Sequence, residues 1–92
     1  MTDKDLYGGM IRLHILHHAA KEPVFGLGII EELRHHGYQL SPGTLYPMLH
    51  GMEKKGYLTS RHDEAGRLSR REYELTVQGL IELTDAINRL IE

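Results

Sequence analysis

Histidine is the residue type that offers the most chemistry in this chain, which holds 7 histidines and no cysteine among 92 residues. His14 and His18 are four residues apart, the spacing at which two imidazoles on one helical face can chelate a divalent ion. His17 falls on another side of that helix, and His35 and His36 come at the end of the next one. No carboxylate or further histidine stands at a diagnostic ligand spacing, so we expect no metal site and no cofactor. A metal-responsive regulator that uses these histidines is kept as an alternative.

Enzymatic chemistry has little support in the sequence. The absence of cysteine excludes a thiolate nucleophile and any disulfide. There is no nucleophile elbow, no phosphate-binding glycine loop and no pair of carboxylates in a catalytic arrangement. We therefore expect a binding protein rather than an enzyme.

The distribution of charge indicates what the chain binds. The formal net charge is −2, which taken alone counts against a nucleic-acid partner. Residues 34–71, however, hold seven basic and three acidic residues, whereas residues 1–33 and 72–92 both hold more acids than bases. A basic middle between acidic ends can direct one face of the molecule toward a polyanion.

Length and composition indicate one small cytoplasmic domain. Hydrophobic residues make up 40% of the chain and charged residues 26%, which is ordinary globular usage. The N-terminus carries acids and no unbroken apolar stretch, so it does not resemble a signal peptide. No stretch approaches the ~20 apolar residues of a membrane span, so no membrane partner is expected.

Hydrophobic periodicity predicts three helices in the first 56 residues. In the first helix, apolar residues recur three or four positions apart and predict one buried face: Leu6, Met10, Leu13, Leu16 and Ala20. Ile11 and Ile15 widen this face. A second helix is expected over 26–36, with Gly37 as its C-terminal cap. The third begins at Ser41 and Pro42, a favoured N-cap and first-turn pair, and ends before Gly56. Pro47 predicts an irregular first turn, with regular helix from about Thr44.

A β-hairpin and a last helix follow. Residues 57–61 and 70–75 are short β-prone runs separated by a polar loop, and Thr76 is placed to cap a helix that runs to the end of the chain. The predicted fold is therefore mainly α with a small β-hairpin, in α-α-α-β-β-α order, which is the winged helix-turn-helix topology. We expect one domain, with residues 1–76 as the winged helix-turn-helix DNA-binding part and 77–92 as a C-terminal dimerisation helix.

The topology predicts where DNA would bind, because the third helix of this fold enters the major groove. The exposed side of that helix is expected to present Gly43, Tyr46, Pro47, His50 and Lys54. The hairpin would act as a wing along the phosphates, with the basic residues Arg61, Arg67, Arg70 and Arg71. Strand alternation favours Arg71 over Arg70 for that role, and Arg70 is expected to pair with Glu72 or Glu74.

The last helix carries more apolar surface than a small domain can cover. Leu80, Leu83, Ile87 and Leu90 keep heptad spacing along it. We therefore expect a homodimer formed through this stripe.

Two segments resemble the PadR-like family of winged helix-turn-helix transcriptional regulators. One runs from Leu40 through Leu49 and on from Met52 to Leu58, and resembles the family's recognition helix. The other, from Arg70 to Gly79, resembles its second wing strand and the start of its final helix. The resemblance implies a short member of the family, with one C-terminal helix, that acts as a homodimeric repressor. It carries the DNA contacts onto Ser41, Pro42, Gly43, Thr44, Tyr46, Pro47, Arg71 and Tyr73.

The expected partners are double-stranded DNA, at a roughly palindromic operator, and a second copy of the chain. A small-molecule effector is compatible with this interpretation but is not identified by the sequence. The alternative from another class is a winged-helix module that binds proteins and not DNA. Basic residues on the third helix and the wing favour DNA, since a protein-binding module has no need of them there.

Overall fold

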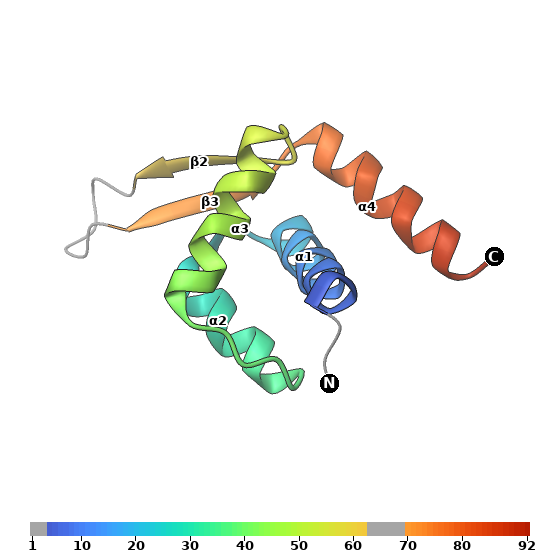
Figure 1. Cartoon of the computed structure of the whole chain (residues 1–92). Helices are drawn as coiled ribbons and strands as arrows, with labels where there is room; N and C mark the ends of the chain where they lie inside the picture. Colours follow the sequence, from blue (N-terminus) through green and yellow to red (C-terminus); the bar gives the residue numbers. More distant parts are fainter. Residues whose placement is uncertain (1–3, 63–69) are drawn as a thin grey trace.

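The computed structural model describes residues 4–62 and 70–92. Four helices and three strands follow one another as α1 (Lys4–Lys21), β1 (Val24–Phe25), α2 (Gly26–His35), α3 (Pro42–Lys54), β2 (Leu58–His62), β3 (Arg71–Leu75) and α4 (Val77–Leu90). In Figure 1, α1 lies between α4 and the α2–α3 pair, and β2 and β3 extend together beyond the helices. The predicted mainly helical winged helix-turn-helix fold is confirmed.

The sheet has three strands rather than the two that were predicted. Their order is β1-β3-β2, and both pairings are antiparallel. Val24 lies opposite Tyr73 in β1, and Leu58 lies opposite Leu75 in β2. Periodicity could not reveal β1, because a strand of two residues is too short to alternate and its partner lies far along the chain.

The buried face predicted for α1 is confirmed for Ile11, Ile15 and Leu16 but is wrong for Leu6, Met10 and Ala20. Ile11 and Ile15 are buried in the core, whereas Leu6 is 65% exposed and Met10 45% exposed. Both stripes are apolar, so the sequence does not say which one faces the interior. Packing decides it, since α2 and β3 contact one side of α1 and α4 contacts another.

The remaining core agrees with the predicted helix faces. Ile29 and Leu33 of α2 are buried against Leu45, Leu49 and Met52 of α3 in one hydrophobic cluster. Burial of such side chains contributes about 1.5–3 kcal/mol each to folding. This cluster fixes α3 on α2 and leaves the opposite side of α3 exposed.

The ends of α2 and α3 form two similar caps. Gly37 and Gly56 have φ values of 87° and 85°, a conformation that glycine adopts without a Cβ penalty. At the first cap, Tyr38 N donates to the Leu33 carbonyl at 2.9 Å. The same bond recurs between Tyr57 N and the Met52 carbonyl at 2.9 Å. Both predicted glycine caps are confirmed, and both have the Schellman pattern.

Pro47 does not interrupt α3, which is continuous from Pro42 to Lys54. The irregular first turn that we predicted is therefore wrong. The missing N–H of Pro47 removes only the donor to the Gly43 carbonyl. Gly43 lies exposed in the first turn, where water can take that place.

The predicted cap of α4 is confirmed. Thr76 Oγ1 accepts a hydrogen bond from Gly79 N at 2.9 Å and donates to the Gly56 carbonyl at 2.5 Å. Gly79 is buried so closely against the Tyr57 carbonyl that a Cβ there would overlap it. The start of α4 is thus held against the turn before β2, and α4 then passes one side of α1, which it contacts (Figure 1). None of the helices in the described part of the chain is long and apolar enough to cross a membrane.

Candidate nucleic-acid interface

The outward side of α3 carries the polar and small residues that the sequence predicted there. Gly43, Pro47, His50 and Lys54 are all exposed. Small residues near the start of the helix allow its backbone to approach another surface closely. His50 and Lys54 follow one and two turns later on the same side and offer hydrogen-bond donors.

The N-terminus of α3 presents two hydroxyl groups and the backbone N–H of Gly43 to solvent, because the N–H groups of Thr44 and Leu45 both donate to the Ser41 carbonyl. Ser41 occupies the N-cap position, but its side chain makes no cap bond to the helix; its Oγ lies 3.3 Å from Thr44 Oγ1. Pro42 has no N–H, and it begins a helix whose dipole is positive at this end. Such an end favours an anion such as a phosphate.

Tyr46 is only half-buried, and it serves the packing of α3 as well as its outer side. Its ring belongs to the partly buried residues that pack against the core. The ring lies across Gly26 at the start of α2, where an added Cβ would overlap the ring and its hydroxyl. On its outer side, the ring centroid is 6.5 Å from that of His50. Full exposure of Tyr46, expected from the helical phase, is corrected to a position shared between core and surface.

Tyr73 does not lie on the surface, which corrects its assignment as a DNA-contact residue. Its side chain is fully buried, because its position in β3 points into the core between β1 and β2. The hydroxyl has no hydrogen-bond partner among the residues that the structure describes. Burial raises the pKa of Tyr73, Glu53 raises it further, and Arg71 opposes them. Tyr73 is a core residue of the wing.

Arg71 lies on the side of the wing that faces α3. Its Nη1 donates a hydrogen bond to Ser60 Oγ at 3.0 Å, and Ser60 Oγ donates to Glu53 Oε2 at 2.5 Å. Glu53 belongs to α3, so this chain of bonds joins β3 and β2 to α3. Arg71 is itself exposed. Its guanidinium therefore has a defined position near α3 and retains donors for an anion.

Arg61 and Arg70 are paired with glutamates of β3. Arg61 Nη2 lies 3.7 Å from Glu72 and 3.4 Å from Glu74, and Arg70 Nη2 lies 3.8 Å from Glu72. The guanidinium of Arg70 also stacks at 3.9 Å over the ring of Phe25. The predicted pairing of Arg70 is confirmed. Counting charges along the sequence did not reveal that these two arginines are neutralised locally. Arg67 lies outside the described residues.

Lys54 and Lys55 extend the positive charge at the C-terminal end of α3. Both are exposed, and neither forms an ion pair with another residue of the segments 4–62 and 70–92. With Arg71 they place three cations around the C-terminal half of α3. The Glu53 carboxylate between them is engaged by Ser60.

A histidine cluster joins α1 to the end of α2, and sequence spacing did not reveal it. The His14 ring centroid lies 4.8 Å from that of His36, and the His18 centroid lies 6.0 Å from it. Tyr38 packs its ring edge against His14 at 5.2 Å. The absence of a third ligand was our reason to expect no metal site, and that reason is wrong. His36 reaches the cluster only because the α1–α2 connection folds back.

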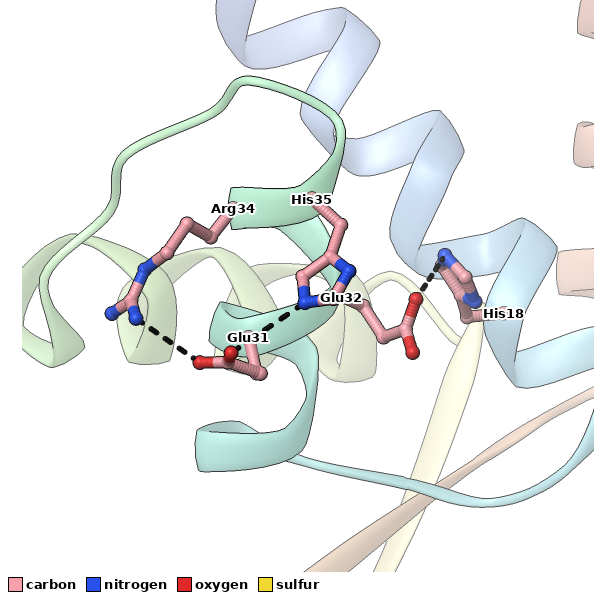
Figure 2. Close-up of polar contacts among 5 residues, drawn as sticks. All are labelled: His18, Glu31, Glu32, Arg34 and His35. Atoms are coloured by element: carbon pink, nitrogen blue, oxygen red, sulfur yellow. Dashed lines mark ion pairs between the residues drawn. The ribbon is translucent and has the colours of Figure 1, made fainter.

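The surroundings of His14 and His18 both disfavour a protonated imidazole, and an acidic neighbour opposes this only at His18. Burial lowers the pKa of His14 and of His18, and neighbouring imidazoles lower both further. Glu32 opposes the change at His18, with its Oε2 4.0 Å from His18 Nε2 (Figure 2). The groups that act on one or both histidines are His17, Lys21, Glu32 and His36, besides the pair itself. The nearby Glu31 carboxylate is separate, since it pairs with Arg34 and His35 (Figure 2).

The four residues predicted for dimerisation do not share one environment. Leu83 is only 5% exposed and belongs to the protein's own core, so it is corrected to an intradomain residue. Leu80, Ile87 and Leu90 are exposed. An open apolar groove between α1 and α4 is lined by Met10, Leu13, His14, His17, Leu83, Ile87 and Leu90. The exposed stripe of α1 and that of α4 therefore form one continuous surface.

These elements define a winged helix-turn-helix protein with α3 in the recognition position and β2–β3 as the wing. The Transcriptional regulator PadR-like family matches residues 15–85, and the chain belongs to this family. The chain is 48% identical to Transcriptional regulator Rv3488 of Mycobacterium tuberculosis over 75 aligned residues. The aligned segment covers 82% of this chain and 70% of Rv3488.

Solved structures agree with this placement. A PadR family transcriptional regulator from Eggerthella lenta superposes with a TM-score of 0.83 at 29% identity, covering 94% of this chain and 76% of that one. Bacillus subtilis PadR in complex with operator DNA superposes with a TM-score of 0.72 at 26% identity, covering 85% of this chain and 47% of that one.

Proposed function

We propose that this PadR-like regulator binds double-stranded DNA as a homodimer and represses transcription from a roughly palindromic operator. The observation that carries the proposal is the exposed side of α3 with Arg71 held beside it, in a chain of this family. The neighbouring PadR structure in complex with operator DNA supports the choice of DNA over a protein partner. The proposal describes a regulator without enzymatic activity, placed with the DNA in the cytoplasm.

In this proposal, α3 lies in the major groove, with both of its ends near phosphates and its middle near the bases. Ser41, Pro42, Gly43 and Thr44 lie against the phosphate backbone, where the helix dipole, the Gly43 N–H and the two hydroxyl groups stabilise an anion. Pro47 and His50 face the base edges, and Tyr46 contributes only the outer part of its ring. Lys54 reaches a phosphate at the far end of the helix.

The wing contributes through Arg71, whose guanidinium is held on the α3 side of the sheet by Ser60. Arg61 and Arg70 are assigned to the structure of the wing, because their charges are already paired with Glu72 and Glu74. Arg67, which lies outside the described residues, remains a proposed minor-groove contact.

The dimer is proposed to form through the surface shared by α1 and α4, with residues 1–76 serving DNA binding and 77–92 serving association. Leu80, Ile87 and Leu90 are 49%, 43% and 72% exposed, which leaves a large apolar area without cover in a single chain. Binding to two successive major grooves requires the two α3 helices of this dimer to lie about 34–36 Å apart.

Selection of bound duplexes from a random pool with the purified protein tests DNA binding directly. We expect one motif with two related half-sites. His50→Ala should then weaken binding to that motif by about tenfold or more and weaken binding to random DNA far less, since a good base contact is worth about 1–3 kcal/mol. Failure to enrich any motif, or an equal loss on both DNAs, would contradict base reading by α3.

Sedimentation tests the dimer independently of DNA. The double variant Ile87→Glu, Leu90→Glu should sediment as a monomer with unchanged helical content, because it places two charges per chain in the apolar surface. Gln78→Glu with Asn88→Glu is the control, since it adds the same charge to α4 at polar positions. A dimer that persists in the first variant would place the interface elsewhere.

A further inference from the structure

The histidine cluster between α1 and α2 has the composition and spacing of a metal site. One side-chain ligand atom from each of His14, His18 and His36 lies within 4.8 Å of the other two. In a tetrahedral site with metal–nitrogen bonds of about 2.0–2.1 Å, ligand nitrogens are roughly 3.4 Å apart. Small rotations of three imidazole rings would therefore close the set around one ion.

The ligands are presented by elements that are already fixed. His14 and His18 are one turn apart on α1, which places both rings on the same face. His36 is the C-cap residue that follows α2, directly before Gly37. His36 is exposed while the other two are half-buried, so an ion can enter from solvent without opening the core.

His18 provides a second and independent indication. Its Nε2 is buried without a hydrogen-bond partner among the described residues. The Glu32 carboxylate is the nearest acid, but at 4.0 Å it is too far for a hydrogen bond. A buried polar atom without a hydrogen-bond partner lowers the stability of the folded protein. An ion bound to His18 would give this nitrogen a partner and would therefore stabilise the fold. Glu32 is close enough to orient His18 or to take a fourth coordination position.

We propose that His14, His18 and His36, assisted by Glu32, bind one divalent transition-metal ion of the zinc type. Imidazole nitrogens suit zinc, copper, nickel and cobalt, whereas magnesium and calcium prefer oxygen ligands. The chain has no cysteine, so thiolate does not compete for the ion. This site is separate from the exposed side of α3 and from the wing.

The position of the site gives metal binding a route to the DNA interface. A bound ion ties α1 to the end of α2, at the turn that leads into α3. His14 also lines the groove between α1 and α4. Metal binding therefore favours one arrangement of α3 relative to the proposed dimer surface, and should change affinity for DNA. This regulatory step rests on the proposed function, whereas the metal site does not.

Calorimetric titration of the tag-free protein with Zn²⁺ alone tests the site. We expect one ion per chain, at least tenfold weaker binding in His36→Ala, and no change in His35→Ala, which removes the adjacent imidazole outside the cluster. Glu32→Gln should weaken binding by about 10–100-fold, the range for groups that support a metal ligand. Because Glu32 is exposed, Glu32→Gln should remain folded, so weaker Zn²⁺ binding by this variant cannot be attributed to unfolding.

Substitution by Co²⁺ provides a spectroscopic check, since ordered nitrogen coordination gives visible absorption bands that His36→Ala should abolish. No stoichiometric binding by the unaltered chain, or equal losses in His35→Ala and His36→Ala, would overturn the site. The regulatory step is overturned if Zn²⁺ binds with one ion per chain and DNA affinity does not change. Loss of DNA binding under all conditions, with Zn²⁺ binding intact, would refute the proposed function and leave the site standing.

Discussion

Replacing Arg71 should change how DNA affinity depends on salt, and replacing Arg61 should not. Both residues are exposed arginines on adjacent strands, so Arg71→Gln and Arg61→Gln remove the same net charge from the wing. They differ in their partners. Arg71 is hydrogen-bonded to Ser60 on the α3 side, whereas Arg61 lies within 4 Å of two glutamates.

The magnitude follows from counterion release. Each phosphate contact contributes a slope of about −0.9 to the logarithm of affinity against the logarithm of salt concentration. A dimer contains two copies of Arg71, so Arg71→Gln should reduce the slope by about 1.8. When salt is raised from about 50 to 200 mM, DNA affinity should fall for both proteins. The fold-loss should be roughly ten times smaller for the variant than for the unaltered protein. Arg61→Gln should leave the slope within experimental error.

Fluorescence anisotropy on one selected duplex, at several salt concentrations, provides the measurement. Circular dichroism should show that both variants remain folded. An unchanged slope in Arg71→Gln would remove this residue from the phosphate contacts. Equal changes in the two variants would show that only net charge matters, and would refute the distinction drawn from the ion pairs.

Three further predictions concern stability, each measured by urea denaturation. Tyr73→Phe should leave the free energy of unfolding unchanged or raise it by up to about 1 kcal/mol, since the buried hydroxyl has no described partner; a loss above about 1 kcal/mol would reveal an unrecognised hydrogen bond. Thr76→Ala should cost about 1–2 kcal/mol because it removes the cap to Gly79, and an unchanged stability would show that the cap is dispensable. Stability should fall as pH is lowered through the ordinary histidine pKa of 6.5, because the lowered pKa values of His14 and His18 let the unfolded chain bind protons first. The double variant in which both become Gln should flatten this dependence, and an unchanged profile would contradict the assignment.

Local patterns determined much of the fold because their physical causes are local. Gly37 and Gly56 end helices in a conformation that other residues rarely adopt, and Thr76 caps the helix that follows it. The buried residues of α3 recur every three or four positions, so the opposite side had to be the exposed one. The order of these elements was enough to predict the winged helix-turn-helix.

The errors arose where the outcome depends on segments that meet only in the folded chain. The heptad pattern placed Leu83 in a dimer interface, but α1 packs against α4 and buries it. Strand alternation put Tyr73 on the same face as Arg71 correctly, but could not show that this part of the sheet is buried against the helical core. Charge counting treated the wing arginines alike, although Arg61 forms ion pairs with Glu72 and Glu74 and Arg71 reaches Glu53 only through Ser60.

The sequence by itself therefore determined the four helices, the hairpin, the caps and most of the outward side of α3, since these depend on backbone conformation and on periodicity within one segment. The tertiary structure alone decided which stripe of α1 is buried, which arginine keeps its charge available and which histidines meet. His14 and His18 are neighbours by helix geometry, but His36 joins them only when α2 folds back against α1. Proximity between distant segments is a product of the packed core, and no local pattern contains it.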